Sequence, residues 1–95
     1  MRRNGRTDAN QDRIVTALRD GGASVCITSN LGNGAPDIIA GYRGANFLLE
    51  VKDGDQPPSR RKLTPDEVTF HDNWRGQIAV VENVEQALLI VFGMG

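Results

Sequence analysis

The sequence predicts a single α/β domain in which a mixed sheet is flanked by helices, with the elements in the order α-β-β-β-α-β-α. Three observations lead to this prediction. The chain has 95 residues, a length that suits one domain. Apolar residues recur at helical spacing near both ends, whereas the middle holds short apolar runs separated by glycine-rich turns. A strong helix start at Thr64 separates the last strand from the three before it.

The first element is expected to be a helix over residues 8–20. Apolar residues between Ile14 and Leu18 recur at helical spacing, so one face of this helix is predicted to be buried. Thr7 or Asp8 can cap its start, and the two glycines that follow the helix can end it.

Three strands are expected next. The first covers residues 23–28 and is followed by a glycine-rich loop over residues 29–34. The second covers residues 36–42, a tight turn follows at residues 43–46, and the third strand covers residues 47–52. The short turn predicts that the second and third strands form an antiparallel hairpin.

The second helix has a clear sequence signature at its start. Thr64 is a typical N-cap, a proline follows at the first helical position, and Glu67 completes a capping box. This helix is expected to run to about Arg75 and to be followed by a strand over residues 77–82 and a short helix over residues 84–92.

Composition argues against several classes of protein. No apolar stretch approaches the roughly 18 residues that span a membrane. Residues 1–7 are basic and expected to be flexible, but no apolar segment follows them as in a secretory signal. The single cysteine, Cys26, rules out a disulfide within the chain and is expected to be a small buried apolar residue in a reducing compartment. The loop over residues 29–34 lacks the phosphate-binding pattern of nucleotide sites, so no nucleotide cofactor is expected.

Charge in the third predicted strand marks the candidate site. Glu50 and Lys52 are two residues apart, so their side chains point to the same face of the sheet, within an otherwise apolar strand. Asp37 opens the neighbouring strand, and pairing around the expected turn places it opposite Val51 or Lys52. The hairpin is therefore expected to bring Asp37 close to both charged residues.

Two carboxylates held together repel each other unless a cation lies between them. Mg²⁺ and Mn²⁺ prefer oxygen ligands, which Asp37, Glu50 and the backbone carbonyl of Val51 can supply. Such an ion can activate water for phosphodiester hydrolysis, and Lys52 can stabilise the transition state. The competing interpretation is a surface ion pair between Glu50 and Lys52 with little energetic value.

Three segments together resemble the PD-(D/E)XK nuclease superfamily. They are residues 34–41 (GAPDIIAG), 47–54 (FLLEVKDG) and 63–67 (LTPDE). The most similar branch is the small VRR-NUC type of phages and prophages, which is similar to archaeal Holliday-junction resolvases. The resemblance covers nearly the whole chain and implies a restriction-endonuclease-like core for the single domain of residues 1–95.

The resemblance implies roles for particular residues. Asp37 and Glu50 match the metal ligands, and Lys52 matches the catalytic lysine. The family usually adds an acidic residue or a glutamine on the first helix. Gln11 occupies that position here, with Asp8 as the second candidate and Asp12 adjacent. Many members carry glutamine near position 67, where this chain has Glu67, which its capping box explains without chemistry.

The function expected from these features is a Mg²⁺- or Mn²⁺-dependent DNA endonuclease that acts on branched DNA, as a homodimer. By resemblance, it would work in the cytoplasm of a bacterial host. The alternatives are a non-catalytic nucleic-acid-binding module that keeps the fold, and a structural domain. Overall charge of −1 does not indicate DNA binding, whereas the basic clusters favour it. Those clusters are Arg2, Arg3 and Arg6, and Arg60, Arg61 and Lys62.

Three side chains on the second helix are given structural roles at this point. His71 is the only histidine, which makes a zinc site improbable, and it is expected to be structural. Phe70 and Trp74 are spaced four apart and are expected to lie in the core or in a dimer interface. The cluster from Arg60 to Lys62 is expected either to contact DNA phosphates or to be a solvated loop.

Overall fold

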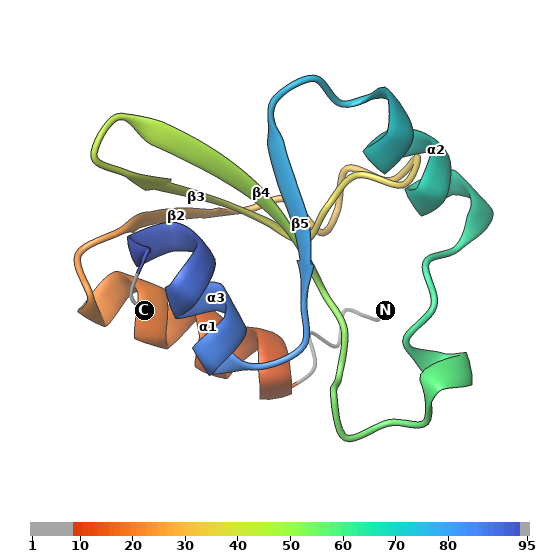
Figure 1. The fold of residues 1–95 in the computed structure, drawn as a ribbon, viewed down its shortest axis with the longest axis horizontal. Helices are drawn as coiled ribbons and strands as arrows, with labels where there is room; N and C mark the ends of the chain where they lie inside the picture. Colours follow the sequence, from red (N-terminus) through yellow and green to blue (C-terminus); the bar gives the residue numbers. More distant parts are fainter. Residues whose placement is uncertain (1–8, 94–95) are drawn as a thin grey trace.

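The computed structural model describes residues 9–93, which form a four-stranded mixed sheet with helices (Figure 1). The sheet order is β2-β3-β4-β5; the first two pairings are antiparallel and the pairing of β4 with β5 is parallel. The predicted class and element order are confirmed, with one 3-10 turn added. The elements are α1 (Ala9–Asp20), β2 (Ser24–Ile27), β3 (Ile38–Tyr42), β4 (Ala45–Val51), the 3-10 turn η1 (Pro58–Arg60), α2 (Pro65–Asn73), β5 (Gln77–Val81) and α3 (Val84–Phe92).

Several predictions concern residues outside the described part of the chain. They are the capping of the first helix by Thr7 or Asp8, the flexible segment over residues 1–7, and the cluster of Arg2, Arg3 and Arg6. Among residues 9–93, no helix is long and apolar enough to cross a membrane.

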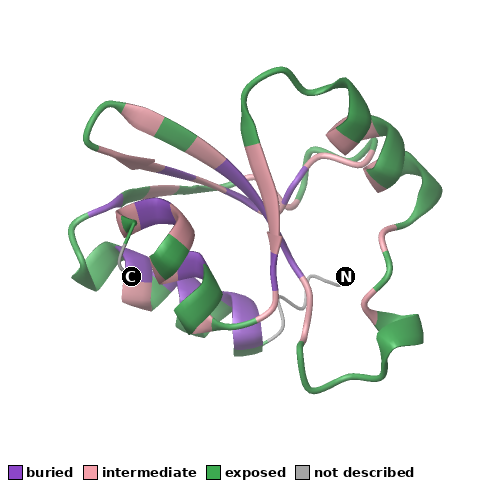
Figure 2. Ribbon diagram, in the orientation of Figure 1, coloured by how far each residue is buried: buried purple, intermediate pink, exposed green. Residues whose placement is uncertain are grey.

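The hydrophobic core lies between one face of the sheet and the helices α1 and α3. In Figure 1 these two helices lie together, and α2 lies apart from them. Figure 2 shows the buried positions on α1, on α3 and along the central strands, whereas α2 has no buried residue. Fully buried side chains at the centre include Ile14, Leu18, Ile38, Leu49 and Val81. The core thus supports one face of β4, and the opposite face carries Glu50 next to the apolar Leu48.

Helix α2 begins as the sequence predicted. The Thr64 hydroxyl accepts a hydrogen bond from the Glu67 N–H, and the Glu67 carboxylate accepts one from the Thr64 N–H. The helix ends at Asn73 and not at Arg75, because Trp74 has extended backbone angles and leads the chain toward β5.

The β3–β4 hairpin is tighter than predicted. Only Arg43 and Gly44 form the turn, and both have positive φ angles, 52° and 82°, as a two-residue hairpin turn requires. Ile38 therefore pairs with Leu49, so that Asp37 is level with Glu50. The predicted pairing of Asp37 with Val51 or Lys52 was wrong, because the expected four-residue turn shifted the register.

Cys26 also differs from its prediction, since it is exposed. Strand alternation explains this position. Val25 pairs with the buried Ala40 and packs against the core, so Cys26 points to the opposite face of β2. The helices α1 and α3 cover the other face of the sheet, so the Cys26 side chain is open to solvent.

Candidate active site

Strand β4 places Glu50 and Lys52 on the face of the sheet that lies away from α1 and α3. Its alternate residues Leu49 and Val51 belong to the core, so the charged side chains must point the other way. Glu50 is only 4% exposed and is the one buried charged residue among residues 9–93. A surface ion pair, the competing interpretation of these two residues, is therefore wrong.

Asp37 is fixed beside Glu50 by backbone contacts on both sides. Its N–H donates to the Leu49 carbonyl at 3.1 Å, and its own carbonyl accepts from the Thr28 N–H at 2.8 Å. Its carboxylate accepts a hydrogen bond from the Val51 N–H at 2.7 Å. The hairpin register thus aims the Asp37 carboxylate along the backbone of β4, toward the charged face.

The carboxyl groups of Asp37 and Glu50 interact directly, through charge repulsion when both are ionised and through a side-chain hydrogen bond when Glu50 is protonated. Burial, followed by the nearby charge of Asp37, raises the pKa of Glu50 to about 9. Burial also raises the pKa of Asp37, although the hydrogen bond from the Val51 N–H opposes this shift. Glu50 Oε1 is buried and has no hydrogen-bond partner among the described residues. A buried oxygen without a donor, next to a second carboxylate, fits a site for a cation.

Lys52 lies between two carboxylates. Its Nζ is 2.9 Å from Glu67 Oε1 and 3.6 Å from Glu50 Oε2. Burial disfavours the charged form of Lys52, but the hydrogen bond to Glu67 and the charge of Glu50 outweigh it and raise its pKa. Lys52 is accordingly a cation at neutral pH and sits at the edge of the carboxylate pair.

Gln11 joins the site from helix α1 through a serine. It is 5% exposed, and its Nε2 donates to Ser29 Oγ at 3.2 Å. Ser29 Oγ in turn donates to the Asp37 carbonyl at 3.3 Å. Gln11 thus lies next to the segment that carries Asp37, and its role at a metal stays a prediction. Asp12 is exposed, and Asp8 lies outside the described residues.

The candidate metal site contains few charged ligands. Within residues 9–93, no three side chains of the types His, Cys, Asp and Glu are grouped so that they could hold a metal ion. Any divalent ion would therefore depend on the two carboxylates supplemented by neutral oxygens. Gln11 and the Val51 carbonyl remain the predicted sources of those oxygens.

The three basic residues Arg60, Arg61 and Lys62 differ in their surroundings. Arg61 donates to the Gln56 carbonyl at 2.8 Å and forms an ion pair with Glu82 at 3.2 Å. Arg60 and Lys62 are exposed. Arg61 therefore has a structural role in the loop, and the other two cations are accessible to a ligand.

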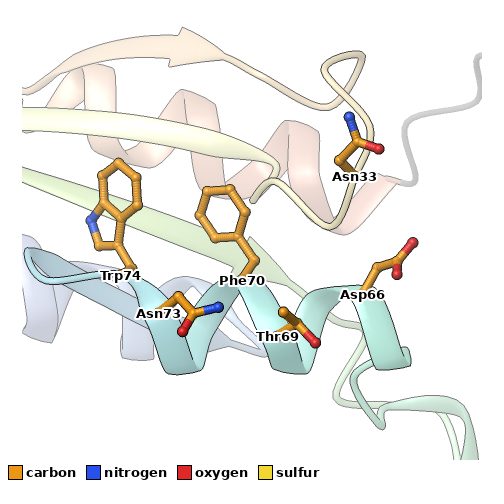
Figure 3. A pocket seen from close by; sticks show the side chains of 6 residues that line it. All are labelled: Asn33, Asp66, Thr69, Phe70, Asn73 and Trp74. Atoms are coloured by element: carbon orange, nitrogen blue, oxygen red, sulfur yellow. The ribbon is translucent and has the colours of Figure 1, made fainter.

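Helix α2 and the loop after β2 enclose a groove of about 340 Å³ (Figure 3). Its lining is Asn33 from the loop and Asp66, Thr69, Phe70, Asn73 and Trp74 from the helix and its end. The rings of Phe70 and Trp74 stack at 5.3 Å, and Trp74 is 43% exposed. The expected core position of Trp74 is therefore wrong, and the alternative expectation of a dimer interface stays a prediction.

Two residues of the site were not assigned to it from the sequence. Ser29, which links Gln11 to the Asp37 carbonyl, belongs to no sequence motif that indicates such a contact. Glu67 was recognised as a helix cap, but its contact with Lys52 joins residues 15 apart in sequence and depends on where α2 lies. His71, which was expected to be structural, has a buried Nε2 without a hydrogen-bond partner among the described residues.

The raised carboxyl pKa values predict how pH affects the metal-free protein. Between about pH 4.5 and pH 9, Glu50 stays protonated in the folded state and ionises in the unfolded state. The folded state binds more protons in this range, so stability falls as pH rises. Asp37, whose pKa is also raised, adds to this trend. Thermal unfolding in the presence of a chelator should therefore give a higher melting temperature at pH 6 than at pH 8.5. The Glu50→Gln variant should show a flatter profile, and an equally steep profile in that variant would contradict the assignment.

Comparison with known proteins finds similarity at the level of solved structures. No protein-family model and no curated protein matches the sequence. A solved structure of a VRR_NUC domain is similar, with a TM-score of 0.62 and 26% sequence identity over 87% of this chain and 96% of that chain. The relation to phage enzymes and to archaeal Holliday-junction resolvases stays a prediction. The chain therefore resembles a VRR_NUC domain, a PD-(D/E)XK nuclease-type domain, as the sequence predicted.

Proposed function

We propose that this protein is a metal-dependent DNA endonuclease that hydrolyses phosphodiester bonds. The observation that carries the proposal is the buried Glu50 next to the half-buried Asp37, with Lys52 beside them, on a nuclease-type fold. A binding module without catalysis does not need a buried carboxyl group whose ionisation is disfavoured by burial and by a second carboxyl group beside it.

The proposed metal ligands are Asp37 and Glu50, with Gln11 and the carbonyl of Val51 as neutral oxygen donors. The partnerless Glu50 Oε1 supports this set. When bound, Mg²⁺ or Mn²⁺ neutralises charge on the phosphodiester and lowers the pKa of a coordinated water. Two carboxylates with neutral donors suit a hard ion that keeps several waters.

The protein residues orient and stabilise the reacting groups. The Val51 N–H fixes the Asp37 carboxylate, and the core beneath Leu49 and Val51 fixes the strand that carries Glu50. Lys52 offers an ammonium at the edge of this pair, where it can donate a hydrogen bond to a phosphate oxygen as negative charge develops. Water attacks phosphorus directly in the proposed reaction, and no covalent intermediate with the protein is needed.

The DNA backbone is proposed to contact the loop that carries Arg60 and Lys62. Both cations are exposed, whereas Arg61 is held by Glu82. Phosphate contacts of this kind are sequence-independent and weaken as salt concentration rises. This division makes Arg60 and Lys62 the phosphate-binding members of the cluster.

Branched DNA is the proposed substrate and a homodimer the proposed assembly. Two sites related by a two-fold axis suit the cutting of paired strands. Exposed large apolar side chains, among them Leu31 at 67% and Leu89 at 53%, are available for an interface. Light scattering of the purified protein measures its mass, and a monomer at micromolar concentration would contradict the dimer.

Cleavage assays test the proposed function directly. Purified protein is incubated with duplex, single-stranded and four-way-junction DNA in Mg²⁺ or Mn²⁺. We expect cleavage, with the four-way junction cut fastest, and complete loss of cleavage when EDTA is added. Lys52→Ala protein purified in parallel should be inactive, which excludes a contaminating nuclease. The proposal fails if no substrate is cut under any of these conditions, or if the Lys52→Ala protein is fully active.

A further inference from the structure

One oxygen of Glu67 contacts both the start of helix α2 and the candidate active site. Glu67 Oε1 accepts a hydrogen bond from the Thr64 N–H at 2.9 Å and another from Lys52 Nζ at 2.9 Å. We propose that Glu67 is a positioning residue that holds the Lys52 ammonium in its working place through this shared oxygen. This inference rests on the proposed nuclease function.

The distances favour Glu67 over Glu50 as the group that orients the lysine. Lys52 Nζ lies 2.9 Å from Glu67, within hydrogen-bond range, but 3.6 Å from Glu50, which is too long for a hydrogen bond. The side chains of Lys52 and Glu67 are 15% and 17% exposed, so their contact is largely shielded from water. A lysine has a flexible four-carbon stem, and without this contact its ammonium would sample several positions.

The position of the shared oxygen is set by the helix backbone. In the capping box the Thr64 hydroxyl holds the Glu67 N–H at 3.3 Å while the Glu67 carboxylate returns to the Thr64 N–H. Both ends of the Glu67 residue are thus fixed by the first turn of α2. The oxygen that Lys52 meets is therefore already in place and needs no rearrangement to receive it.

Helix α2 has few other attachments near the site. None of its residues is buried, and a groove lies between the helix and the loop that carries Asn33. At its start, the backbone of Asp66 approaches Gly34 so closely that a Cβ at Gly34 would overlap it. The contacts of the first turn with the rest of the protein thus include the approach to Gly34 and the hydrogen bond between Lys52 and Glu67. Figure 3 shows that the groove runs along the helix from Asp66 in this turn to Trp74.

Three variants separate positioning from helix stability. Glu67→Ala removes the contact with Lys52 and one cap hydrogen bond, whereas Thr64→Ala removes the other cap hydrogen bond and leaves the contact. Both should lower the melting temperature by about 4–8 °C, the usual effect of a lost cap in a small domain. Glu67→Gln keeps a carbonyl oxygen that can accept from both donors.

We expect kcat for junction cleavage to fall about 30-fold in Glu67→Ala, a loss of about 2 kcal/mol in transition-state stabilisation. Thr64→Ala and Glu67→Gln should stay within about fivefold of the wild-type protein, and KM for DNA should change little in all three. Equal losses of kcat in Thr64→Ala and Glu67→Ala would overturn the inference, because helix stability would then be the cause. A Glu67→Gln protein as slow as Glu67→Ala would overturn it as well.

A second measurement does not depend on cleavage. In the metal-free protein, the Lys52 Nζ–H signal in ¹⁵N side-chain NMR spectra should be slow to exchange in the wild type and in Glu67→Gln, and should be lost in Glu67→Ala. The Lys52→Ala protein assigns this signal. If the wild type cuts no DNA but this pattern holds, the proposed function fails and the positioning contact stands. If the signal persists in Glu67→Ala, the positioning inference fails.

Discussion

Replacing Glu50 by glutamine should abolish metal-dependent cleavage while the protein stays folded. The substitution removes one of two carboxylates in the proposed site and leaves the side-chain shape nearly unchanged. A bound ion contributes several kcal/mol to stabilising a phosphodiester transition state, so we expect cleavage to fall by about 10³-fold or more. The folded protein should tolerate the change, because the raised pKa keeps Glu50 protonated near neutral pH in the metal-free state.

Two measurements test this prediction. Calorimetric titration with Mn²⁺ should show binding to the wild type and none to Glu50→Gln. Mn²⁺ should raise the melting temperature of the wild type only, since a ligand stabilises the state that binds it. Glu85→Gln, a change of an exposed glutamate on α3, is the matched control and should behave as the wild type. A Glu50→Gln protein that cleaves DNA within tenfold of the wild-type rate would refute the assignment of Glu50.

Local sequence signals predicted much of the fold around the site. The capping box at Thr64 and Glu67 was confirmed, because it depends only on residues three apart. Strand alternation correctly placed Glu50 and Lys52 on one face of the strand, and the structure shows that the other face, with Leu49 and Val51, packs in the core. Both features depend on residues two or three apart in the sequence, so a short segment is enough to predict them.

Features that depend on turns and distant contacts were predicted less well. The hairpin register was missed because a two-residue turn with Arg43 at positive φ is uncommon for arginine. The exposure of Cys26 depends on which face of the sheet the helices cover, which is a property of the whole fold. The ion pair between Lys52 and Glu67 requires α2 to start beside β4, and no local pattern in the sequence specifies that placement.

Gly34→Ala should lower both the stability of the protein and its rate of DNA cleavage, although Gly34 has no side chain that could take part in catalysis. Gly34 has a φ of 82°, where a non-glycine residue is strained by about 1–3 kcal/mol. Its Cβ would also overlap the carbonyl group of Asp66 and lie 2.9 Å from the Glu67 nitrogen. The first turn of α2 would have to move to make room, and Glu67 would move away from Lys52. We expect a melting temperature lower by at least about 8 °C and a loss of kcat at least as large as that of Glu67→Ala.

Gly32→Ala is the control that separates strain from overlap. Gly32 lies in the same loop with a φ of 74°, but a Cβ there meets no atom within 4 Å. It should therefore lose stability through backbone strain alone and keep a nearly unchanged kcat. Both variants are compared at a temperature where circular dichroism shows each to be fully folded. If the two lose kcat equally, the close approach of Gly34 to α2 does not set the position of Glu67, and the loop affects catalysis in another way.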